Sequence, residues 1–196
     1  TARSAPPEAG QGLEELDAMV NAAAIVSRFK KNKVMGMAGA LDTARFAYFI
    51  SEKLGVSVND IQGVLMGGHG DDMVPVRSYC QVAGIPVERL ISTQRLEEIE
   101  NRTRQAGGEI IALLKTGSAF YSPASAEIQM TEAYLYDKKL ILPCAAYLEG
   151  EYGINGVYFG VPVQIGAGGV EHVIELALSE KEKQEMAVSV SHVQEL

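Results

Sequence analysis

Residues 61–72 of the chain read IQGVLMGGHGDD, a β-rich run that leads into a loop around His69. The β-rich run Ile61–Met66 has the composition and length of a strand. Glycines flank His69 on both sides, and they allow the backbone to turn sharply and leave the imidazole accessible. The stretch therefore predicts a strand that delivers a histidine to a loop at its end.

A second stretch, LDTAR at residues 41–45, follows the glycine-rich sequence GMAG at residues 36–39. We expect a short strand at Val34-Met35, a turn, and then a helix that begins near Asp42. Asp42 and Arg45 are three positions apart, so they share one face of this helix. Its apolar stripe would consist of Phe46, Phe49, Ile50 and Leu54.

His69, Asp42 and Arg45 are the three kinds of group that hydride transfer to or from a 2-hydroxy acid requires. An imidazole can move the hydroxyl proton, and a carboxylate that accepts the other ring N–H fixes its tautomer. A guanidinium binds a carboxylate through two parallel hydrogen bonds. The sequence thus contains a candidate acid/base, its orienting partner and a substrate clamp.

The same residues allow other interpretations. His69 with Asp71 and Asp72 would be the start of a metal site in a hydrolase, but this set has no plausible ligand spacing. His172 and His192, in an apolar strand and at an exposed helix end, add no ligand and have no comparable partners. We therefore predict that the chain has no metal site. Arg45 alone is equally compatible with a surface residue paired with an acid.

Composition excludes several classes of protein. The chain has 196 residues, a hydrophobic fraction of 47% and a charged fraction of 21%, as expected for a soluble globular domain. A net charge of −8 leaves no basic stripe for nucleic acid. No apolar run reaches the ~18 residues of a membrane span, and the N-terminus has no secretory signal. Cys80 and Cys144 are interpreted as buried, reduced thiols, which favours a cytoplasmic protein.

The remaining pattern alternates helices with strands and predicts an α+β domain. Helices are expected over residues 13–29, 94–114 with a possible break at Gly107-Gly108, 125–136, and from Ser179 onward, where Ser179 and Glu182 form a capping box. Strands are expected as short antiparallel pieces over 73–86 and over residues 140–147, 157–163 and 170–178. The glycine-rich residues 166–169 are interpreted as a tight strand connection, because they lack the Lys-Ser/Thr of a phosphate-binding loop.

Several ordered motifs make the chain resemble the lactate/malate dehydrogenase family, and within it the lactate-dehydrogenase-like bacterial malate dehydrogenases. The resemblance begins near LDAMV (16–20), continues to the C-terminus, and is densest at VMGMAGALDTAR (34–45), GGHGD (67–71), LKTGSA (114–119) and YFGVPV (158–163). It implies the C-terminal substrate-binding domain of that family, an α+β domain of antiparallel strands and long helices.

The resemblance also implies a function, the NAD-dependent interconversion of (S)-malate and oxaloacetate. His69 would be the general acid/base, Asp42 its orienting partner and Arg45 the clamp on the substrate 1-carboxylate. Ser118 would line the substrate pocket; without the resemblance it is simply a polar residue at a helix break. The implied partners are a small dicarboxylic or 2-hydroxy acid and, because relatives form symmetric dimers or tetramers, further copies of the chain.

The chain departs from the family at its N-terminus. Complete members open with a dinucleotide-binding half, whereas no glycine-rich dinucleotide fingerprint precedes His69 here. Residues 1–30 are interpreted as a remnant of that half, an active-site loop stub with a connecting helix, and residues 31–196 as the substrate-binding domain. In the stub, Pro7 stands where the family has a specificity arginine, and Glu14-Glu15 replace an Asn-Pro pair.

These departures limit what can be assigned. The residues that hold NAD stay unassigned, and the chain is expected to be incomplete and inactive alone. Specificity for another 2-hydroxy acid, as in lactate dehydrogenases, stays open because the loop arginine that decides it has no counterpart. A further alternative is a non-catalytic remnant that only oligomerises with full-length relatives.

Overall fold

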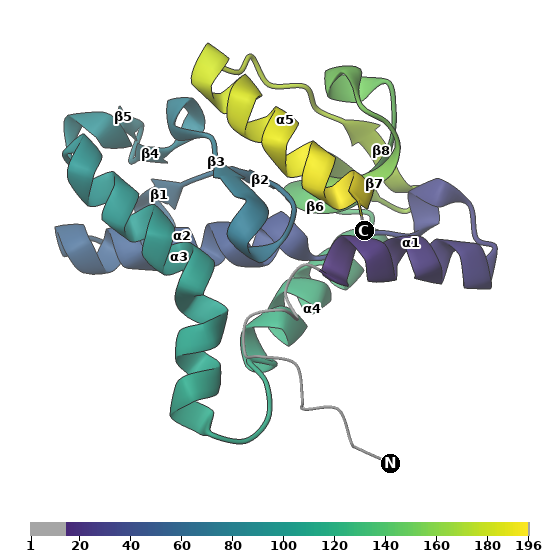
Figure 1. Cartoon of the computed structure of the whole chain (residues 1–196), viewed down its shortest axis with the longest axis horizontal. Coiled ribbons are helices and arrows are strands. Elements are labelled where there is room, and N and C mark those ends of the chain that lie inside the picture. Colours follow the sequence, from purple (N-terminus) through teal and green to yellow (C-terminus); the bar gives the residue numbers. More distant parts are fainter. Residues whose placement is uncertain (1–14, 196) are drawn as a thin grey trace.

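A five-stranded antiparallel sheet lies at the centre of the part of the chain, residues 15–195, that the computed structural model describes. The strand order is β3-β2-β7-β6, and β8 also pairs with β7. The strands are β2 (Leu65–Gly67), β3 (Met73–Pro75), β6 (Leu140–Glu149), β7 (Asn155–Gly166) and β8 (Gly169–Val173). Figure 1 shows helix α5 (Glu180–Glu195) lying across these strands and helix α1 (Glu15–Ser27) beside them. The expected α+β class is confirmed.

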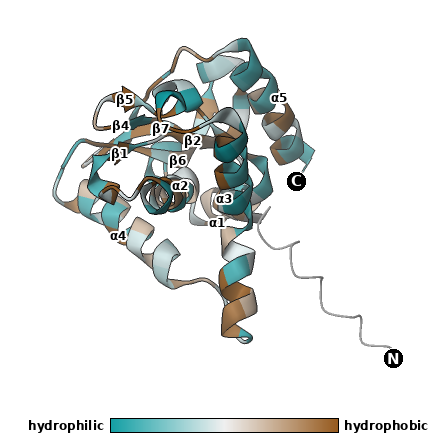
Figure 2. Cartoon of the chain, turned by 90° about the vertical axis from the view of Figure 1, so that its left-hand side faces the viewer, coloured by the Kyte–Doolittle hydropathy of each residue, from teal (hydrophilic) through white to brown (hydrophobic). Residues whose placement is uncertain are grey.

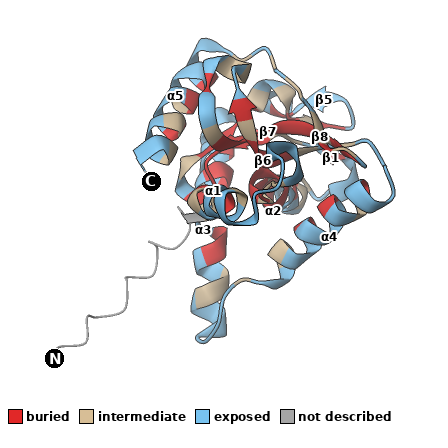
Figure 3. Cartoon of the chain, turned by 90° about the vertical axis from the view of Figure 1, so that its right-hand side faces the viewer, coloured by how far each residue is buried: buried red, intermediate tan, exposed pale blue. Residues whose placement is uncertain are grey.

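The hairpin of β6 and β7 is the longest part of the sheet, and its register pairs Pro143 with Pro162 and Cys144 with Val161. Helices α2, α4 and α5 all contact β7, so the middle of this hairpin is buried on both faces, as Figure 3 shows. Gly166 pairs with Gly169 across the following turn. The tight strand connection expected at residues 166–169 is therefore confirmed.

A second core lies beside the sheet and shares helix α2 (Ala38–Leu54) with it. Phe46, Phe49 and Ile50 are buried there, which confirms the expected apolar stripe, whereas Leu41 belongs to the core of the large sheet. The second core also contains α3 (Thr93–Leu114) and a small sheet of β1 (Ile61–Gln62), β4 (Gln81–Val82) and β5 (Ile85–Pro86). Because α2 spans both cores, its residues between Leu41 and Phe46 lie at their junction.

A close approach of two glycines places β2 against β7. Gly67 pairs with Gly160, and a Cβ atom on Gly160 would lie only 2.2 Å from the carbonyl oxygen of Gly67. Gly67 itself has a φ of +89°, which side chains rarely adopt. The glycines that the sequence places before His69 thus serve the sheet as well as the loop.

Three expectations about strands are wrong, and two of them concern residues 34–66. Val34-Met35 forms no strand; only Gly36 makes an isolated bridge, to Ala145, because the 3-10 turn Lys31–Lys33 directly precedes it and leaves too little extended chain. The run Ile61–Met66 is not one strand, since it divides at Gly63-Val64 into β1 of the small sheet and β2 of the large one. Apolar composition alone does not reveal that the two ends of this run join different sheets.

The short strands expected over residues 73–86 are confirmed as β3, β4 and β5. The strand expected over 170–178 is too long, because β8 ends at Val173. After that residue, the backbone N–H groups of Leu176 and Ala177 donate to the hydroxyls of Tyr152 and Tyr79 rather than to a neighbouring strand. After Val173, side-chain hydroxyls therefore take the place of the backbone acceptors of a neighbouring strand.

Within residues 15–195, each expected helix is present, but its ends differ from those expected. Helix α3 is continuous through Gly107-Gly108, although its direction changes along its length in Figure 1, so the possible break there is absent. Helix α4 (Tyr121–Leu135) begins four residues before the expected residue 125, because Pro123 is tolerated in a first turn. The capping box of α5 is confirmed, since the Ser179 N–H donates to Glu182 Oε2 and the Glu182 N–H to Ser179 Oγ.

Shorter 3-10 turns connect these elements, at Lys31–Lys33, Val58–Asp60, Gly70–Asp72, Arg77–Tyr79, Val87–Arg89 and Glu151–Gly153. Both cysteines are free and buried, as expected, and burial raises the pKa of Cys80 to about 11 and that of Cys144 to about 12. Within residues 15–195, no helix combines the length and hydropathy that crossing a bilayer requires.

Candidate active site

Two segments that are distant in the sequence bring His69 and Asp42 together. His69 follows β2, Asp42 lies in the second turn of α2, and their side chains meet although 27 residues separate them in the chain. His69 Nδ1 lies 2.8 Å from Asp42 Oδ2, and both side chains are almost fully buried. A carboxylate accepts from Nδ1–H, so Nε2 is the nitrogen available for proton exchange with a substrate. The predicted contact between the His69 ring and the Asp42 carboxylate is therefore present.

Arg45 lies one helical turn beyond Asp42 on the same face of α2. Its Nη1 is 3.7 Å from Asp42 Oδ1, and its side chain is 11% exposed. Burial lowers the pKa of Arg45 from its ordinary value, and the neighbouring Asp42 charge opposes that shift. Among the described residues, Arg45 Nε and Asp42 Oδ1 have no hydrogen-bond partner. A buried guanidinium with an unused donor is suited to a carboxylate ligand.

His69 and Arg45 line one cavity of about 1060 Å³. Ser118, in the connection between α3 and α4, lines the same cavity and is exposed. The structure thus places all four predicted site residues at or next to this cavity, with Asp42 behind the histidine. Much of the opposite wall is apolar and comes from α1 and the segment before α2, including Leu16, Val20, Met35 and Met37.

Asp17 is a site residue that the sequence reasoning missed. It lies on α1, its carboxylate is only 3% exposed, and its Oδ2 accepts the backbone N–H of His69 at 3.3 Å. Burial is the main cause that raises its pKa to about 6. A signal was available in the sequence, because Asp17 precedes Val20 by three positions and therefore sits on the apolar face of its helix.

The ionisation of Asp17 should make stability depend on pH. The pKa of Asp17 is about 6 in the folded chain against an ordinary 3.8, so folding opposes its ionisation. Below about pH 4 the group is protonated in both states and contributes nothing; between pH 4 and 6 the free energy of unfolding falls by about 3 kcal/mol. Asp17→Asn removes this loss, so the variant should gain about that much stability relative to the wild type between pH 4 and 7.5.

Urea unfolding at pH 4 and pH 7.5 measures this difference. Asp60→Asn, at an exposed position, is the matched control and should follow the wild type at both pH values. Parallel pH dependence of the wild type and Asp17→Asn would contradict the assignment of a buried, ionising carboxylate.

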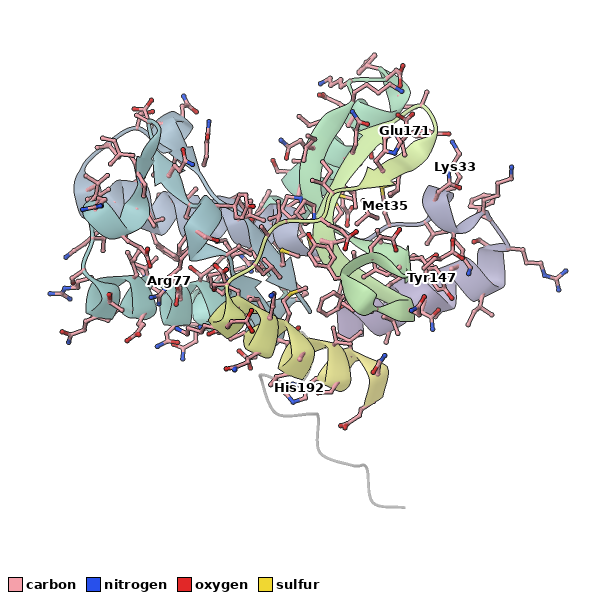
Figure 4. The ribbon with its side chains drawn as sticks, turned by 90° about the horizontal axis from the view of Figure 1, so that it is seen from above. Lys33, Met35, Arg77, Tyr147, Glu171 and His192 are labelled. Carbon is pink, nitrogen blue, oxygen red and sulfur yellow. The ribbon has the colours of Figure 1, made fainter. Side chains whose placement is uncertain are left out.

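His192 has a partner, contrary to the expectation from sequence. Its Nδ1 lies 2.7 Å from Asp72 Oδ1, and Figure 4 shows the residue on α5. On the same helix, Ser189 Oγ accepts the N–H of Gly68 and donates to the carbonyl oxygen of Asp72. Helix α5 therefore holds the loop that contains His69. The contacts join residues 117 to 121 positions apart, so local patterns did not reveal them.

No group of three or more His, Cys, Asp or Glu side chains within the described part of the chain is arranged to hold a metal ion. Asp72, which the metal interpretation used, instead pairs with His192. Asp71 is exposed in the same loop. Asp71 and Asp72 therefore do not gather around His69 as a ligand set in the described residues.

Comparison with known proteins gives consistent matches. A family model described as the lactate/malate dehydrogenase, alpha/beta C-terminal domain matches residues 39–195. Malate dehydrogenase 1 of Anaeromyxobacter dehalogenans is 56% identical over 91% of this chain and 57% of its own length. The malate dehydrogenase of Roseiflexus castenholzii is 59% identical over 85% of this chain and 54% of its own length. The chain therefore spans little more than half the length of these curated relatives.

Solved structures agree. The malate dehydrogenase of Salinibacter ruber superposes with a TM-score of 0.89 at 56% identity, covering 92% of this chain and 59% of that one. A lactate dehydrogenase of Eimeria maxima, solved with NADH and oxamate, gives a TM-score of 0.87 at 42% identity, covering 92% of this chain and 58% of that one. Both kinds of dehydrogenase thus share the fold described above.

Proposed function

Because the chain belongs to the lactate/malate dehydrogenase family, we propose that it is the substrate-binding part of an NAD-dependent malate dehydrogenase. The reaction is the interconversion of (S)-malate and oxaloacetate. The observation that carries this proposal is the His69–Asp42 hydrogen bond beside the Arg45 guanidinium at one cavity. This arrangement holds a proton donor, its orienting carboxylate and a carboxylate clamp in one place.

Each residue has one task in the reaction. Arg45 binds the 1-carboxylate of the substrate, and His69 Nε2 faces the oxygen on C2. When bound, NADH supplies the hydride that reduces C2 of oxaloacetate. His69 Nε2–H donates its proton to the keto oxygen, which becomes the hydroxyl of malate. In the reverse direction, Nε2 takes that proton back. Asp42 stabilises the imidazolium that exists between these steps, and Ser118 lines the substrate pocket.

The described residues fit one part of NAD and not another. The apolar wall formed by Leu16, Val20 and Met35 suits the flat nicotinamide ring. Every strand pair within residues 15–195 is antiparallel, so this part of the chain contains no parallel βαβ unit to cradle a pyrophosphate. We assign residues 1–30 to the side of the dinucleotide-binding half and residues 31–196 to the substrate-binding domain. Residues 1–14 of that stub lie outside the described residues.

We also propose that a cytoplasmic homo-oligomer forms. Apolar side chains are exposed on α1 and at the end of α3, including Val26 at 83% and Leu113 at 81%. Figure 2 shows the apolar residues gathered at the far end of α3. Surfaces of this kind favour association with another protein surface.

A fusion protein tests the proposed activity. In this fusion, called the joined enzyme, the dinucleotide-binding half of the Salinibacter ruber malate dehydrogenase precedes this chain. The oxidation of NADH is followed by absorbance. We expect turnover of oxaloacetate at about 10 per second, with pyruvate much slower. The 196-residue chain alone should oxidise no NADH, because most of the binding energy for the cofactor comes from the other half.

Each other outcome has a distinct meaning. If the joined enzyme binds NADH, as its fluorescence reports, but reduces neither acid, the chain is a non-catalytic remnant. Faster turnover of pyruvate than of oxaloacetate would support the alternative specificity of a lactate dehydrogenase. Turnover by the isolated chain would show that the cofactor binds without the second half.

A further inference from the structure

Asp17 is a buried carboxylate that the proposed reaction does not use. It lies on α1, which precedes the residues that the family model matches. Its Oδ2 accepts the N–H of His69 across 52 positions of the chain, whereas its Oδ1 has no partner within the described residues. Such a carboxylate weakens folding wherever it is ionised. Because Asp17 accepts a hydrogen bond from the backbone of His69, its role is to be sought at the candidate site and not in stability.

The loop around His69 is held at successive backbone groups by side chains from two helices. The N–H of Gly68 donates to Ser189 Oγ on α5, and the next N–H, that of His69, donates to Asp17 on α1. His69 then caps the 3-10 turn Gly70–Asp72 with an extended backbone, φ −73° and ψ 141°. These bonds determine where the Cα–Cβ bond of His69 points. The ring is held separately, by Asp42 on α2.

The position of α1 makes the contact with Asp17 informative. Leu16, Met19, Val20 and Ala23 of this helix line the cavity that His69 and Arg45 also line. A displacement of α1 would therefore reshape the apolar wall and release the His69 N–H at the same time. The other carboxylates near Asp17 are Asp42 and Asp72, and Asp72 is already paired with His192. Asp17 thus links α1 directly to the backbone of the histidine.

We propose that Asp17 is a positioning residue for His69, which ties helix α1 to the histidine backbone and so directs the imidazole toward Asp42 and the cavity. Its importance for catalysis rests on the proposed function, in which His69 transfers the proton. The link itself is independent of any activity. It can be measured in the 196-residue chain without substrate or cofactor.

Nuclear magnetic resonance of the 196-residue chain labelled with ¹⁵N-histidine tests the link, because the chain has only three histidines. Asp17→Leu removes the acceptor for the His69 N–H and puts an apolar side chain of related size in its place. We expect the His69 amide proton to exchange with solvent about tenfold faster or more, which corresponds to the loss of one hydrogen bond. The Nδ1–H signal of the His69–Asp42 bond should shift and broaden, because the ring is no longer held in one orientation.

Two further variants separate positioning from general stability. Asp17→Asn keeps a side-chain oxygen and should restore both the slow exchange of the His69 amide proton and the sharp Nδ1–H signal. Val87→Ala weakens the second core, which contains no residue of α1 and not His69, and should leave both signals unchanged. If Val87→Ala changes them as much as Asp17→Leu, or if Asp17→Leu leaves them as in the wild type, the proposal is overturned.

A measurement on the unsubstituted chain covers the case in which Asp17→Leu does not fold. In a chain that is also labelled with ¹³C-aspartate, the signal of the Asp17 carboxyl carbon reports the ionisation of that group. The chemical shift of the His69 amide proton should change with pH at the same midpoint as this carbon signal, near pH 6. This step should be absent in Asp17→Asn. A His69 amide shift without this step overturns the link. Inactivity of the joined enzyme, with these signals as expected, would instead overturn only the proposed function.

Discussion

In the joined enzyme, His69→Gln lowers the turnover of oxaloacetate by about 10²–10⁴-fold, the range that loss of a general acid/base produces. Glutamine keeps a polar side chain of related length but cannot carry a proton at the position of Nε2. Binding of NADH should be unchanged, because the cofactor is held mainly by the other half. Steady-state rates with saturating NADH measure the effect.

The control for this variant is His172→Gln. His172 is exposed on β8 and does not line the cavity, so its replacement should leave the rate unaltered. His192 is unsuitable as a control because it contacts Asp72 in the loop of His69. A His69→Gln enzyme with nearly full turnover would show that another group transfers the proton.

Asp42→Asn in the joined enzyme is expected to lower turnover by roughly 10²–10⁴-fold, as in other sites where a carboxylate orients a histidine. The asparagine amide can donate to Nδ1 and so place the ring proton on Nε2, which is the wrong tautomer for malate oxidation. Loss of the negative charge also disfavours the imidazolium that oxaloacetate reduction needs. Rates in both directions, measured across pH, report the two effects separately.

A double variant tests whether Asp42 acts through His69. Residues that work as a unit are not additive, so Asp42→Asn combined with His69→Gln should be no slower than His69→Gln alone. Asp71→Asn, an exposed aspartate in the same loop, should have little effect on its own. A double variant whose loss is the product of the two single losses would mean that Asp42 has a separate task, such as holding Arg45.

Much of the fold follows from local patterns in the sequence. The period of apolar residues located the helices, and the capping box at Ser179 and Glu182 marked the start of α5. The errors arose where one run of residues pairs with strands of two different sheets. Ile61–Met66 is one β-rich run in the sequence, yet its first residues join the small sheet and its last ones the large sheet. Composition reports that a segment is buried but not which strand lies beside it.

The candidate site was predictable to a similar extent. A spacing of three places Asp42 and Arg45 on one helical face, an inference that needs only local geometry. The expectation that the glycines leave the His69 imidazole accessible is wrong, because residues 67–70 and the ring are buried by segments distant in the sequence. That His69 meets Asp42, rather than another carboxylate, was inferred from chemical need and from resemblance. Ser118 was assigned by resemblance alone, and the structure adds only that it lines the same cavity.

The sequence by itself determined which chemical groups are present and which of them share a helix face or a loop, because these properties depend on residue type and on the short periods of helix and strand. Only the tertiary structure decided what holds His69 in place. Its backbone is fixed by Asp17 from 52 positions away, and the preceding Gly68 by Ser189 from 121 positions away. Each of these hydrogen bonds requires the donor and the acceptor to meet within about 3 Å. Whether they meet depends on the path of the whole chain, which the short repeats of helix and strand in the sequence do not reveal.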